Sequence, residues 1–378
     1  MNVIYFQSGG PTAVINSSLF GVISKFQSTP EIDKLYCSRF GIEGILNDEL
    51  IEIERNKDYS FLKTLPGSFT GSARLKLSSD FNDEKYNKIL ATVNKYKIDV
   101  IIVNGGNDSM DTGMKLSNFF KAKNFNVKVF GIPKTIDNDL ANCDFTPGFG
   151  SALNYIVQSV IDTRLDMNSY KKGRVVIVEA MGRNAGWLAA SSIVAKKFDL
   201  GPDLIYVSEI PFNKEKFLKD VKKIYESKGS ALIVTSEYLE DENGKFIAEA
   251  DKQDVFGHIQ LDGSLSEFLA KEVERELGFN TRYIVLNTLQ RSSTKCISSF
   301  DSDVASKCGE LALSSALEGK KNGTISIKLS SDFKVSYVLE DFEKAANWVR
   351  KMPPSFINDD KNFITKEGLK YFEFFYNK

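Results

Sequence analysis

Short apolar runs alternate with longer segments of helical period along the first part of the chain. Val and Ile fill the short runs almost continuously, and such runs are typical of strands that are buried on both faces. The pattern predicts strands at 2–7, 98–104 and 127–132 and helices at 13–26, 82–97 and 109–122. Alternation of this kind is typical of the α/β class, in which helices cover both faces of a mainly parallel sheet.

The same alternation resumes after residue 150. It predicts strands at 174–179, 204–208, 231–235 and 282–287 and helices at 151–168, 185–195, 214–227 and 301–318. Residues 240–260 interrupt it, because they are polar and irregular, and we expect an inserted loop or hairpin there. With 378 residues and about 150 residues per domain, the chain is expected to fold as two domains.

The composition narrows the classes of protein to which this chain can belong. Hydrophobic residues make up 42%, which is enough to build buried cores without disulfides or a structural metal. The 49 basic and 50 acidic residues nearly cancel, which argues against a nucleic-acid-binding protein with a basic surface. His258 is the single histidine, so a multi-histidine zinc site is excluded.

Cysteine usage and hydropathy bear on the compartment. The four cysteines, at 37, 143, 296 and 308, show no CxxC spacing and are expected to be packed thiols. No apolar run approaches the roughly 18 residues of a membrane span, so no membrane partner is expected. The segment MNVIYFQSGG at 1–10 is strand-like and lacks the basic region of a signal peptide. The expected compartment is therefore the cytoplasm.

Three of the predicted strands end in turns rich in Gly, Ser or Asp. These turns are SGGPT at 8–12, GGNDS at 105–109 and PKTIDND at 133–139. Ligands of open α/β sheets bind beyond the carboxyl ends of the strands, where Gly-rich turns and helix N-termini favour anions. Each turn alone is also compatible with a plain strand-to-helix connection, but together they predict a phosphate-rich ligand.

The third turn is the most specific, because it places Lys134, Asp137 and Asp139 within six residues. Phosphoryl transfer needs a carboxylate base and a cation near the transferred group, and this turn supplies both. An Asx-turn followed by a helix cap is the structural alternative for the two aspartates. A single arginine at a strand end is usually a solvated surface residue, but four of the following arginines at strand–loop junctions favour a phosphate clamp. They stand at 74, 174, 183, 282 and 291.

The chain resembles the phosphofructokinases over almost its full length. Motifs of that family occur in the family's order, as GGPTAVIN at 9–16, GSAR at 71–74, GGNDS at 105–109, PKTIDND at 133–139, MGR at 181–183 and QR at 290–291. The resemblance implies two doubly wound α/β domains with mainly parallel sheets and an active site in the interdomain cleft. It implies a phosphoryl-donor-binding domain at 1–148 plus about 290–340, and a fructose-6-phosphate-binding domain at 149–289 plus about 341–378.

The resemblance also implies a reaction and the residues that carry it. A phosphoryl group is transferred to the 1-hydroxyl of fructose 6-phosphate, and Asp137 matches the general base that takes the proton from that hydroxyl. Lys134 and Arg74 are expected to be catalytic with it. The donor side is expected to comprise Gly9, Gly10, Asp108 and Lys134. The sugar side is expected to comprise Thr135, Asp137, Asp139, Arg174, Met181, Gly182, Arg183, Glu237, Arg282 and Arg291.

Two of these arginines bear on assembly, because the family usually draws two sugar-phosphate arginines from a neighbouring subunit. Arg174 lies seven residues before Met181, and Arg282 lies nine residues before Arg291. Both spacings match the family's arginines. The resemblance thus implies a homodimer or homotetramer whose active sites are shared between subunits.

The residues at 108 and 134 bear on the phosphoryl donor. ATP-dependent bacterial relatives typically carry Gly at both positions, whereas this chain has Asp108 and Lys134. A carboxylate at 108 would repel the α-phosphate of a nucleotide at close range in a poorly solvated site. Lys134 would supply the positive charge that the compact donor pyrophosphate needs. The pair is typical of the pyrophosphate-dependent branch of the family.

Three alternatives stay open at this point. The first is an ATP-dependent phosphofructokinase, which the carboxylate of Asp108 argues against. The second is a non-catalytic regulatory subunit of the same fold. Such a subunit has no need of a base, so it is disfavoured by the presence of Asp137, Asp139, Arg74 and Lys134. A periplasmic sugar-binding protein shares the two-domain α/β architecture, but it would need a signal peptide.

The chain departs from the family pattern at a few positions. Asn107 stands where most members have an Asp associated with Mg²⁺, and a neutral amide oxygen is a weaker ligand for this cation. Magnesium, the expected cofactor, would then arrive mostly on pyrophosphate. Phe20 and Ser24 replace the arginines of allosteric members, so we expect a non-allosteric enzyme. Thr288 replaces a His or Tyr, and His258 is expected to be structural or interfacial.

Overall fold

The computed structural model describes residues 1–248, 252–253, 259–260 and 264–378. The chain folds as two compact units. Unit 1 comprises Met1–Thr135, Asp139–Gly148 and Ser299–Val349. Unit 2 comprises Ile136–Asn138, Phe149–Ser298 and Arg350–Lys378. The donor-binding and sugar-binding roles expected for two domains stay predictions.

Unit 1 is built on a seven-stranded sheet with the strand order β13-β12-β5-β4-β1-β2-β3. The strands are β1 (Asn2–Gln7), β2 (Lys34–Ser38), β3 (Leu50–Glu52), β4 (Ile98–Gly105), β5 (Lys128–Pro133), β12 (Gly323–Leu329) and β13 (Val335–Glu340). The inner strands are parallel, whereas the edge strands β3 and β13 are antiparallel to their neighbours. The chain leaves β1 toward β2 on one side and reaches β4 and β5 on the other. Ligand-binding crevices of α/β sheets lie at such a reversal.

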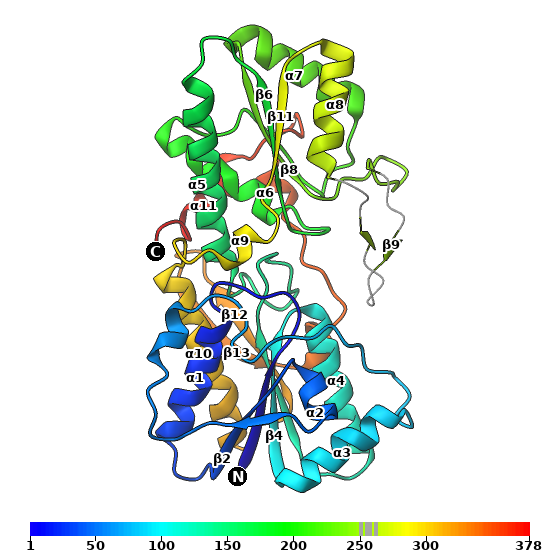
Figure 1. The fold of residues 1–378 in the computed structure, drawn as a ribbon, viewed down its shortest axis with the longest axis vertical. Coiled ribbons are helices and arrows are strands. Elements are labelled where there is room, and N and C mark those ends of the chain that lie inside the picture. The colour runs from blue at the N-terminus through cyan, green and yellow to red at the C-terminus, as the bar shows by residue number, and fades with distance from the viewer. Residues whose placement is uncertain (249–251, 254–258, 261–263) are drawn as a thin grey trace. The chain divides into compact units, whose positions relative to one another are not determined.

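Helices cover both faces of this sheet (Figure 1). They are α1 (Ile15–Gln27), α2 (Ile42–Leu46), α3 (Glu84–Tyr96), α4 (Asn107–Ala122) and α10 (Ser299–Leu317). On one face α1 and α10 lie side by side. A Cβ atom on Gly21 would lie 1.8 Å from the backbone oxygen of Ser306, and one on Gly309 would lie 2.0 Å from that of Ser18. The two glycines therefore allow an approach that a larger residue would prevent.

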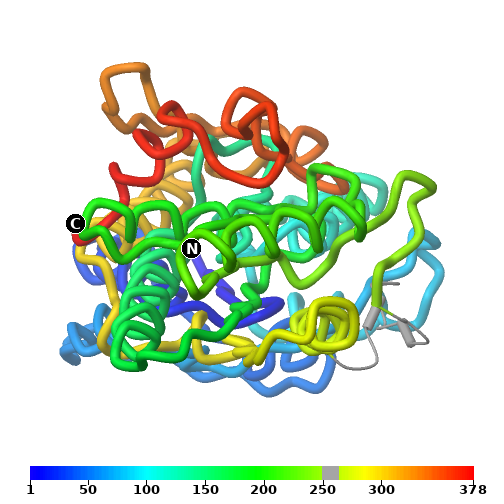
Figure 2. Tube along the Cα trace, turned by 90° about the horizontal axis from the view of Figure 1, so that it is seen from above, coloured from blue at the N-terminus to red at the C-terminus, as the bar shows by residue number. Residues whose placement is uncertain are grey.

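Unit 2 contains a four-stranded parallel sheet with the order β11-β6-β8-β7. The strands are β6 (Val175–Ala180), β7 (Leu204–Tyr206), β8 (Ala231–Ser236) and β11 (Thr281–Val285). The α-helices are α5 (Phe149–Asn168), α6 (Trp187–Ser191), α7 (Lys214–Lys228), α8 (Leu265–Leu277), α9 (Leu289–Ser292) and α11 (Lys366–Glu373). In this unit α7 and α8 cover one face of the sheet, and α5 and α6 cover the other (Figure 1). Figure 2 shows the C-terminal segment and α8 on opposite sides of unit 2. The parallel sheets of the two units confirm the predicted α/β class.

The polar stretch 240–260 contains a short antiparallel pair of strands, β9 (Lys252–Gln253) and β10 (Ile259–Gln260). The inserted loop or hairpin was expected at this place. His258 lies outside the described residues, and its structural or interfacial role stays a prediction. In the part of the chain that the structure describes, no helix has both the length and the apolar character needed to cross a membrane.

Candidate active site

The turns that follow β1, β4 and β5 meet at one edge of the unit 1 sheet. Both β1 and β5 pair with β4 in parallel, so the carboxyl ends of the three strands lie side by side. The backbone N–H of Ser8 donates to the carbonyl oxygen of Asn104 at 2.9 Å. The backbone N–H of Lys134 donates to the carbonyl oxygen of Gly105 at 3.0 Å. The three turns singled out in the sequence are thereby brought together.

The ammonium group of Lys134 is buried against the first of these turns. Its side chain is 3% exposed, and its Nζ donates to the carbonyl oxygen of Gly10 at 2.7 Å. Gly9 has a φ of +77°, and a Cβ atom there would lie 3.4 Å from the same Nζ. A side chain at this position would be strained and would crowd the ammonium group. A glycine turn beside a buried lysine is suited to a compact anion.

The turn that carries Arg74 lies against the glycine turn after β1. Ser8 and Ala73 form an isolated parallel bridge, and Ser72 Oγ donates to the carbonyl oxygen of Gly9 at 2.6 Å. Arg74 follows directly and is exposed at the surface of unit 1. The structure therefore places the backbone of Arg74 next to the glycine turn after β1, and its catalytic role stays a prediction.

Asn107 and Asp139 form a polar pair at the start of α4. The Nδ2 of Asn107 donates to Oδ2 of Asp139 at 3.1 Å, and Asp139 is 7% exposed. The Oδ1 of Asn107 is buried and has no hydrogen-bond partner within the described residues. Amide and carboxylate oxygens are ligands that Mg²⁺ accepts. The described residues contain no group of three or more His, Cys, Asp or Glu that could hold a metal.

Asp108 lies in the first turn of α4, one residue after Asn107, and is half-buried. A carboxylate at this position is stabilised by the helix dipole. The charge at 108 thus stabilises the start of α4. Thr135 lies in the next turn, where its backbone N–H donates to the carbonyl oxygen of Pro147 at 3.2 Å and its own carbonyl oxygen accepts from Thr146 Oγ1 at 2.9 Å.

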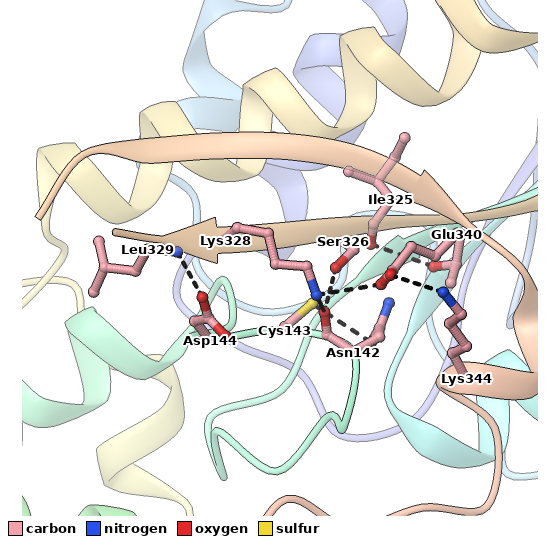
Figure 3. Close-up of polar contacts among 10 residues, drawn as sticks. Asn142, Cys143, Asp144, Ile325, Ser326, Lys328, Leu329, Glu340 and Lys344 are labelled. Carbon is pink, nitrogen blue, oxygen red and sulfur yellow. Dashed lines mark hydrogen bonds and ion pairs between the residues drawn. The ribbon is translucent and has the colours of Figure 1, made fainter. Parts of the chain in front are cut away.

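The segment that returns from this loop is fixed to β12 (Figure 3). The carbonyl oxygen of Asn142 accepts from Ser326 Oγ and from Lys328 Nζ, the latter at 2.9 Å. Asp144 donates its backbone N–H to the carbonyl oxygen of Ile327 at 2.9 Å and accepts the N–H of Leu329 at 2.7 Å. These bonds replace a neighbouring strand, because β5 pairs with β12 only at its first two residues.

The sugar-binding set predicted from MGR and Glu237 is assembled in unit 2. Met181, Gly182 and Arg183 follow β6, and Glu237 follows its neighbour β8. The Oε1 of Glu237 accepts the backbone N–H groups of Gly182 at 3.2 Å and Arg183 at 2.8 Å. Gly182 and Arg183 have φ angles of +146° and +51°, so the turn is sharp. Left-handed backbone is uncommon for a residue such as arginine.

The environment of Glu237 raises the pKa of its carboxyl group to about 7. Burial is the main cause, because it removes water from the charged form. The amide donors of the MGR turn oppose the rise, whereas the charge of Asp137 adds to it. Asp137, the predicted base, therefore lies close enough to Glu237 in unit 2 for the two carboxylates to interact.

The tip of the loop that carries Asp137 is held by two residues that the sequence did not indicate. Asn138 has a φ of +56° and is fully buried. Its carbonyl oxygen accepts from Arg350 Nη2 at 2.9 Å, and its Nδ2 donates to the hydroxyl of Tyr371 at 2.9 Å. The sequence carries one hint of this arrangement, since Asn is among the non-glycine residues that best tolerate positive φ.

Arg174 and Arg282 lie away from the MGR turn of their own chain. Arg174 precedes β6, and Arg282 pairs with Val176 near the amino end of the same strand. At about 3.3 Å per residue, β6 separates these arginines from Met181 by about 20 Å. Arg291 lies on α9, beyond the carboxyl end of β11. Within one chain, unit 2 therefore brings Asp137, Met181, Gly182, Arg183 and Glu237 to one edge and leaves Arg174 and Arg282 at the other.

Comparisons with known proteins agree over nearly the whole chain. Residues 2–316 match the family model described as Phosphofructokinase. A pyrophosphate–fructose 6-phosphate 1-phosphotransferase of Xanthomonas campestris pv. campestris (strain B100) is 39% identical over 98% of this chain and 90% of its own length. Crystal structures of pyrophosphate-dependent phosphofructokinases from Marinobacter aquaeolei and Nitrosospira multiformis give TM-scores of 0.87 and 0.89 at 32% and 30% identity. Both comparisons cover 100% of this chain and 92% of the other.

Proposed function

The chain belongs to the phosphofructokinase family, and on this premise we propose how its residues catalyse phosphoryl transfer. The enzyme transfers a phosphoryl group from pyrophosphate to the 1-hydroxyl of fructose 6-phosphate, giving fructose 1,6-bisphosphate and phosphate. The observation that carries this function is the nearly full-length similarity to the pyrophosphate-dependent enzyme of Xanthomonas campestris. The buried Lys134 beside the Gly9–Gly10 turn supports it, because a compact and highly charged anionic donor needs such a cation.

The sugar side of the reaction falls to residues of unit 2. In our proposal Asp137 accepts the proton of the 1-hydroxyl as its oxygen attacks phosphorus. Glu237 holds a sugar hydroxyl, and its pKa near neutrality lets it accept or donate a hydrogen bond. Met181, Gly182 and Arg183 shape the turn on which the sugar rests. We also propose Thr135 and Asp139, which flank Ile136–Asn138 in the sequence and belong to unit 1, for the sugar and phosphate contacts.

The donor side falls to residues of unit 1. The backbone at Gly9 and Gly10, the ammonium group of Lys134 and the guanidinium group of Arg74 bind pyrophosphate and stabilise the charge that develops on the transferred group. Asn107 Oδ1 and Asp139 would hold Mg²⁺ together with the phosphate oxygens. Bound there, the cation neutralises phosphate charge. The unpartnered Oδ1 and the buried carboxylate fit this group.

We further propose that the field of Asp108 selects pyrophosphate over ATP. The test is a steady-state assay of the purified protein with Mg²⁺, fructose 6-phosphate and either donor. We expect turnover with pyrophosphate and little or none with ATP. Comparable kcat/KM values for the two donors would overturn the donor assignment and favour the ATP-dependent alternative. No turnover with either donor, in a folded protein, would favour the regulatory-subunit alternative.

Replacing Asp108 tests the physical reason for this choice. Asp108→Gly removes charge and bulk, whereas Asp108→Asn removes the charge and keeps the size. We expect both variants to bind ATP more tightly than the wild type and to lose activity with pyrophosphate. An increase in ATP affinity with Asp108→Gly alone would assign the exclusion to size. Unchanged ATP affinity in both variants would remove Asp108 from the explanation.

The remaining expectations are also proposals. We propose a homodimer or homotetramer in which Arg174 and Arg282 reach the sugar phosphate bound by a neighbouring subunit. The separation of these arginines from Met181 within one chain supports it. We also propose a non-allosteric enzyme, because Phe20 and Ser24 cannot pair with effector phosphates. The cytoplasm is the proposed compartment, since the four cysteines are free thiols and fit a reducing environment.

A further inference from the structure

The main chain directly after Asp137 is held by side chains from the C-terminal part of unit 2. Arg350 donates to the carbonyl oxygen of Asn138 at 2.9 Å, and the hydroxyl of Tyr371 accepts from Asn138 Nδ2 at 2.9 Å. Asn138 adopts a positive φ of 56°, which an isolated chain would rarely populate. Two bonds from distant residues therefore stabilise a backbone conformation next to the proposed base.

Arg350 is itself fixed by Trp187. Its guanidinium carbon lies 4.1 Å from the centre of the indole ring, and the indole Nε1 donates to the carbonyl oxygen of Arg350 at 3.0 Å. Trp187 is 1% exposed. A guanidinium group over an aromatic face is attracted to it and loses little freedom when it also donates a hydrogen bond. The donor that reaches Asn138 is therefore preorganised.

Tyr371 is held in the same way by aromatic packing. It lies on α11, beside α6 in unit 2 (Figure 1). Its ring centre is 5.4 Å from that of Trp187 and 5.6 Å from that of Phe356. The indole of Trp187 thus contacts both residues that bond Asn138. The four side chains, Asn138, Trp187, Arg350 and Tyr371, form one group that we call the loop clamp.

We propose that Arg350 and Tyr371 are positioning residues for phosphoryl transfer, which fix the peptide at 138 and thereby the direction of the Asp137 carboxylate. The inference rests on the proposed role of Asp137 as the base. A base must lie within about 2.6–3.2 Å of the proton that it accepts. A misplacement of about 1 Å can lower the rate about 100-fold. The clamp acts on the reacting step and leaves the contacts that bind each substrate in place.

Kinetics of substituted enzymes test this role. We expect Arg350→Met to lower kcat about 10- to 100-fold, while the KM values for fructose 6-phosphate and pyrophosphate stay within about twofold. Arg350→Lys keeps a donor and should recover part of the loss. Tyr371→Phe keeps the ring packing and should lower kcat about 3- to 10-fold. If Arg350→Met fails to fold, the other two variants decide the question.

Matched controls separate this effect from a general loss of stability. Arg275 is an exposed arginine of unit 2 with ion pairs to Glu272 and Glu276, and Arg275→Met should leave kcat unchanged. Tyr225 donates its hydroxyl to the carbonyl oxygen of Gly173 in the same unit, and Tyr225→Phe removes that bond away from the loop. Its kcat should also stay within about twofold of the wild type.

Tryptophan fluorescence reports on the clamp directly. The chain has two tryptophans, so a Trp348→Phe background leaves Trp187 as the single emitter. In that background Arg350→Met should shift the emission of Trp187, because the cation leaves the ring, whereas Arg275→Met should not. An unchanged emission would contradict the contact on which the inference is built.

The outcomes distinguish this inference from the proposed function. A wild-type enzyme that does not use pyrophosphate overturns the proposed function, and the inference falls with it. If the wild type is active and Asp137→Asn is not, but Arg350→Met and Tyr371→Phe retain kcat within about twofold, the clamp alone is overturned. A drop in kcat that is matched by an equal rise in both KM values also overturns it, because a misplaced base should lower kcat and leave both KM values nearly unchanged.

Discussion

At the scale of single residues, the first prediction concerns Asp137, which we propose as the general base. Asp137→Asn exchanges one small polar side chain for another and should leave the fold intact. It removes the proton acceptor, whose contribution is about 100- to 10,000-fold, so we expect the loss in kcat with little change in KM. Steady-state kinetics with pyrophosphate check this. A variant that keeps more than about a tenth of the wild-type kcat would show that Asp137 is not the base.

Glu237 gives a second residue-scale prediction, on stability. The folded state raises the pKa of this carboxyl from 4.5 to about 7, so it binds the proton more tightly than the unfolded chain does. The contribution of this carboxyl to the free energy of unfolding is therefore most favourable below pH 4.5. It falls as the pH rises toward 7 and is constant above that. In Glu237→Gln the amide oxygen can still accept the N–H groups of Gly182 and Arg183, but it does not titrate.

The measurement is the free energy of unfolding from pH 5 to pH 8. We expect the wild type to lose about 2–3 kcal/mol relative to Glu237→Gln over this range. Glu226→Gln on α7 is the control, because Glu226 is 61% exposed and pairs with Lys222 only at the surface. Parallel pH profiles for the wild type and Glu237→Gln would contradict the raised pKa.

At the scale of elements, most strands that the sequence predicted are buried on both faces, although the predicted β11 is largely exposed. The run at 98–104 becomes β4, and the segment at 109–122 becomes most of α4, which begins two residues earlier at Asn107. The strands β2, β3, β12 and β13 were not predicted, although β2 and most of β12 are buried. β13 lies at the sheet edge with alternating partial exposure, so it lacks a continuous apolar run. The predicted helix at 185–195 divides into α6 and a 3₁₀ helix at Ser192–Phe198, a change of hydrogen bonding that apolar spacing does not specify.

The same reasoning explains which parts of the candidate site the sequence could indicate. Gly9 and Lys134 in unit 1, and Glu237 with the MGR turn in unit 2, stand in motifs or next to predicted strands, so the grouping within each unit followed from the order of its parallel strands. Arg350 and Tyr371 bond Asn138 from positions 212 and 233 residues away. No local pattern encodes such a contact, because it depends on how the C-terminal segment packs against α6.

The contact between α1 and α10 gives an element-scale prediction. Ala has a higher helix propensity than Gly, so Gly309→Ala would stabilise an isolated α10 by about 1 kcal/mol. In the folded chain its Cβ would meet the backbone of Ser18, which cannot rotate away as a side chain would. Such crowding costs about 1–3 kcal/mol or more, so we expect a net loss of stability in denaturant unfolding. Lys307→Ala, at an exposed position of the same helix, should stay within about 0.5 kcal/mol of the wild type. Equal stability of Gly309→Ala and Lys307→Ala would show that the helices separate easily.

At the scale of the whole molecule, the two arginines that we propose for the sugar phosphate pose a geometric problem, which a site shared between subunits would solve. Arg174 and Arg282 stand near the amino ends of β6 and β11, whereas Glu237 and the MGR turn stand at the carboxyl ends of β8 and β6. One chain cannot bring both ends of the same strand to one sugar phosphate. In our proposal the guanidinium groups complete the site of a neighbouring subunit, where a charge-assisted contact is worth about 1.5–3 kcal/mol.

Mixing two inactive variants tests this sharing of sites. If Arg282 acts in the neighbouring subunit, a hybrid dimer of Asp137→Asn and Arg282→Ala chains contains one site with both defects and one with neither. With random exchange, half of the dimers are hybrids, so about a quarter of the wild-type activity should return at low fructose 6-phosphate. A mixture of Asp137→Asn and Arg74→Ala chains is the control, because both residues are assigned to the same chain and no intact site can form. Recovery in the first mixture and none in the second would establish the shared site. If neither mixture recovers although native mass spectrometry detects the hybrids, Arg282 acts within its own chain.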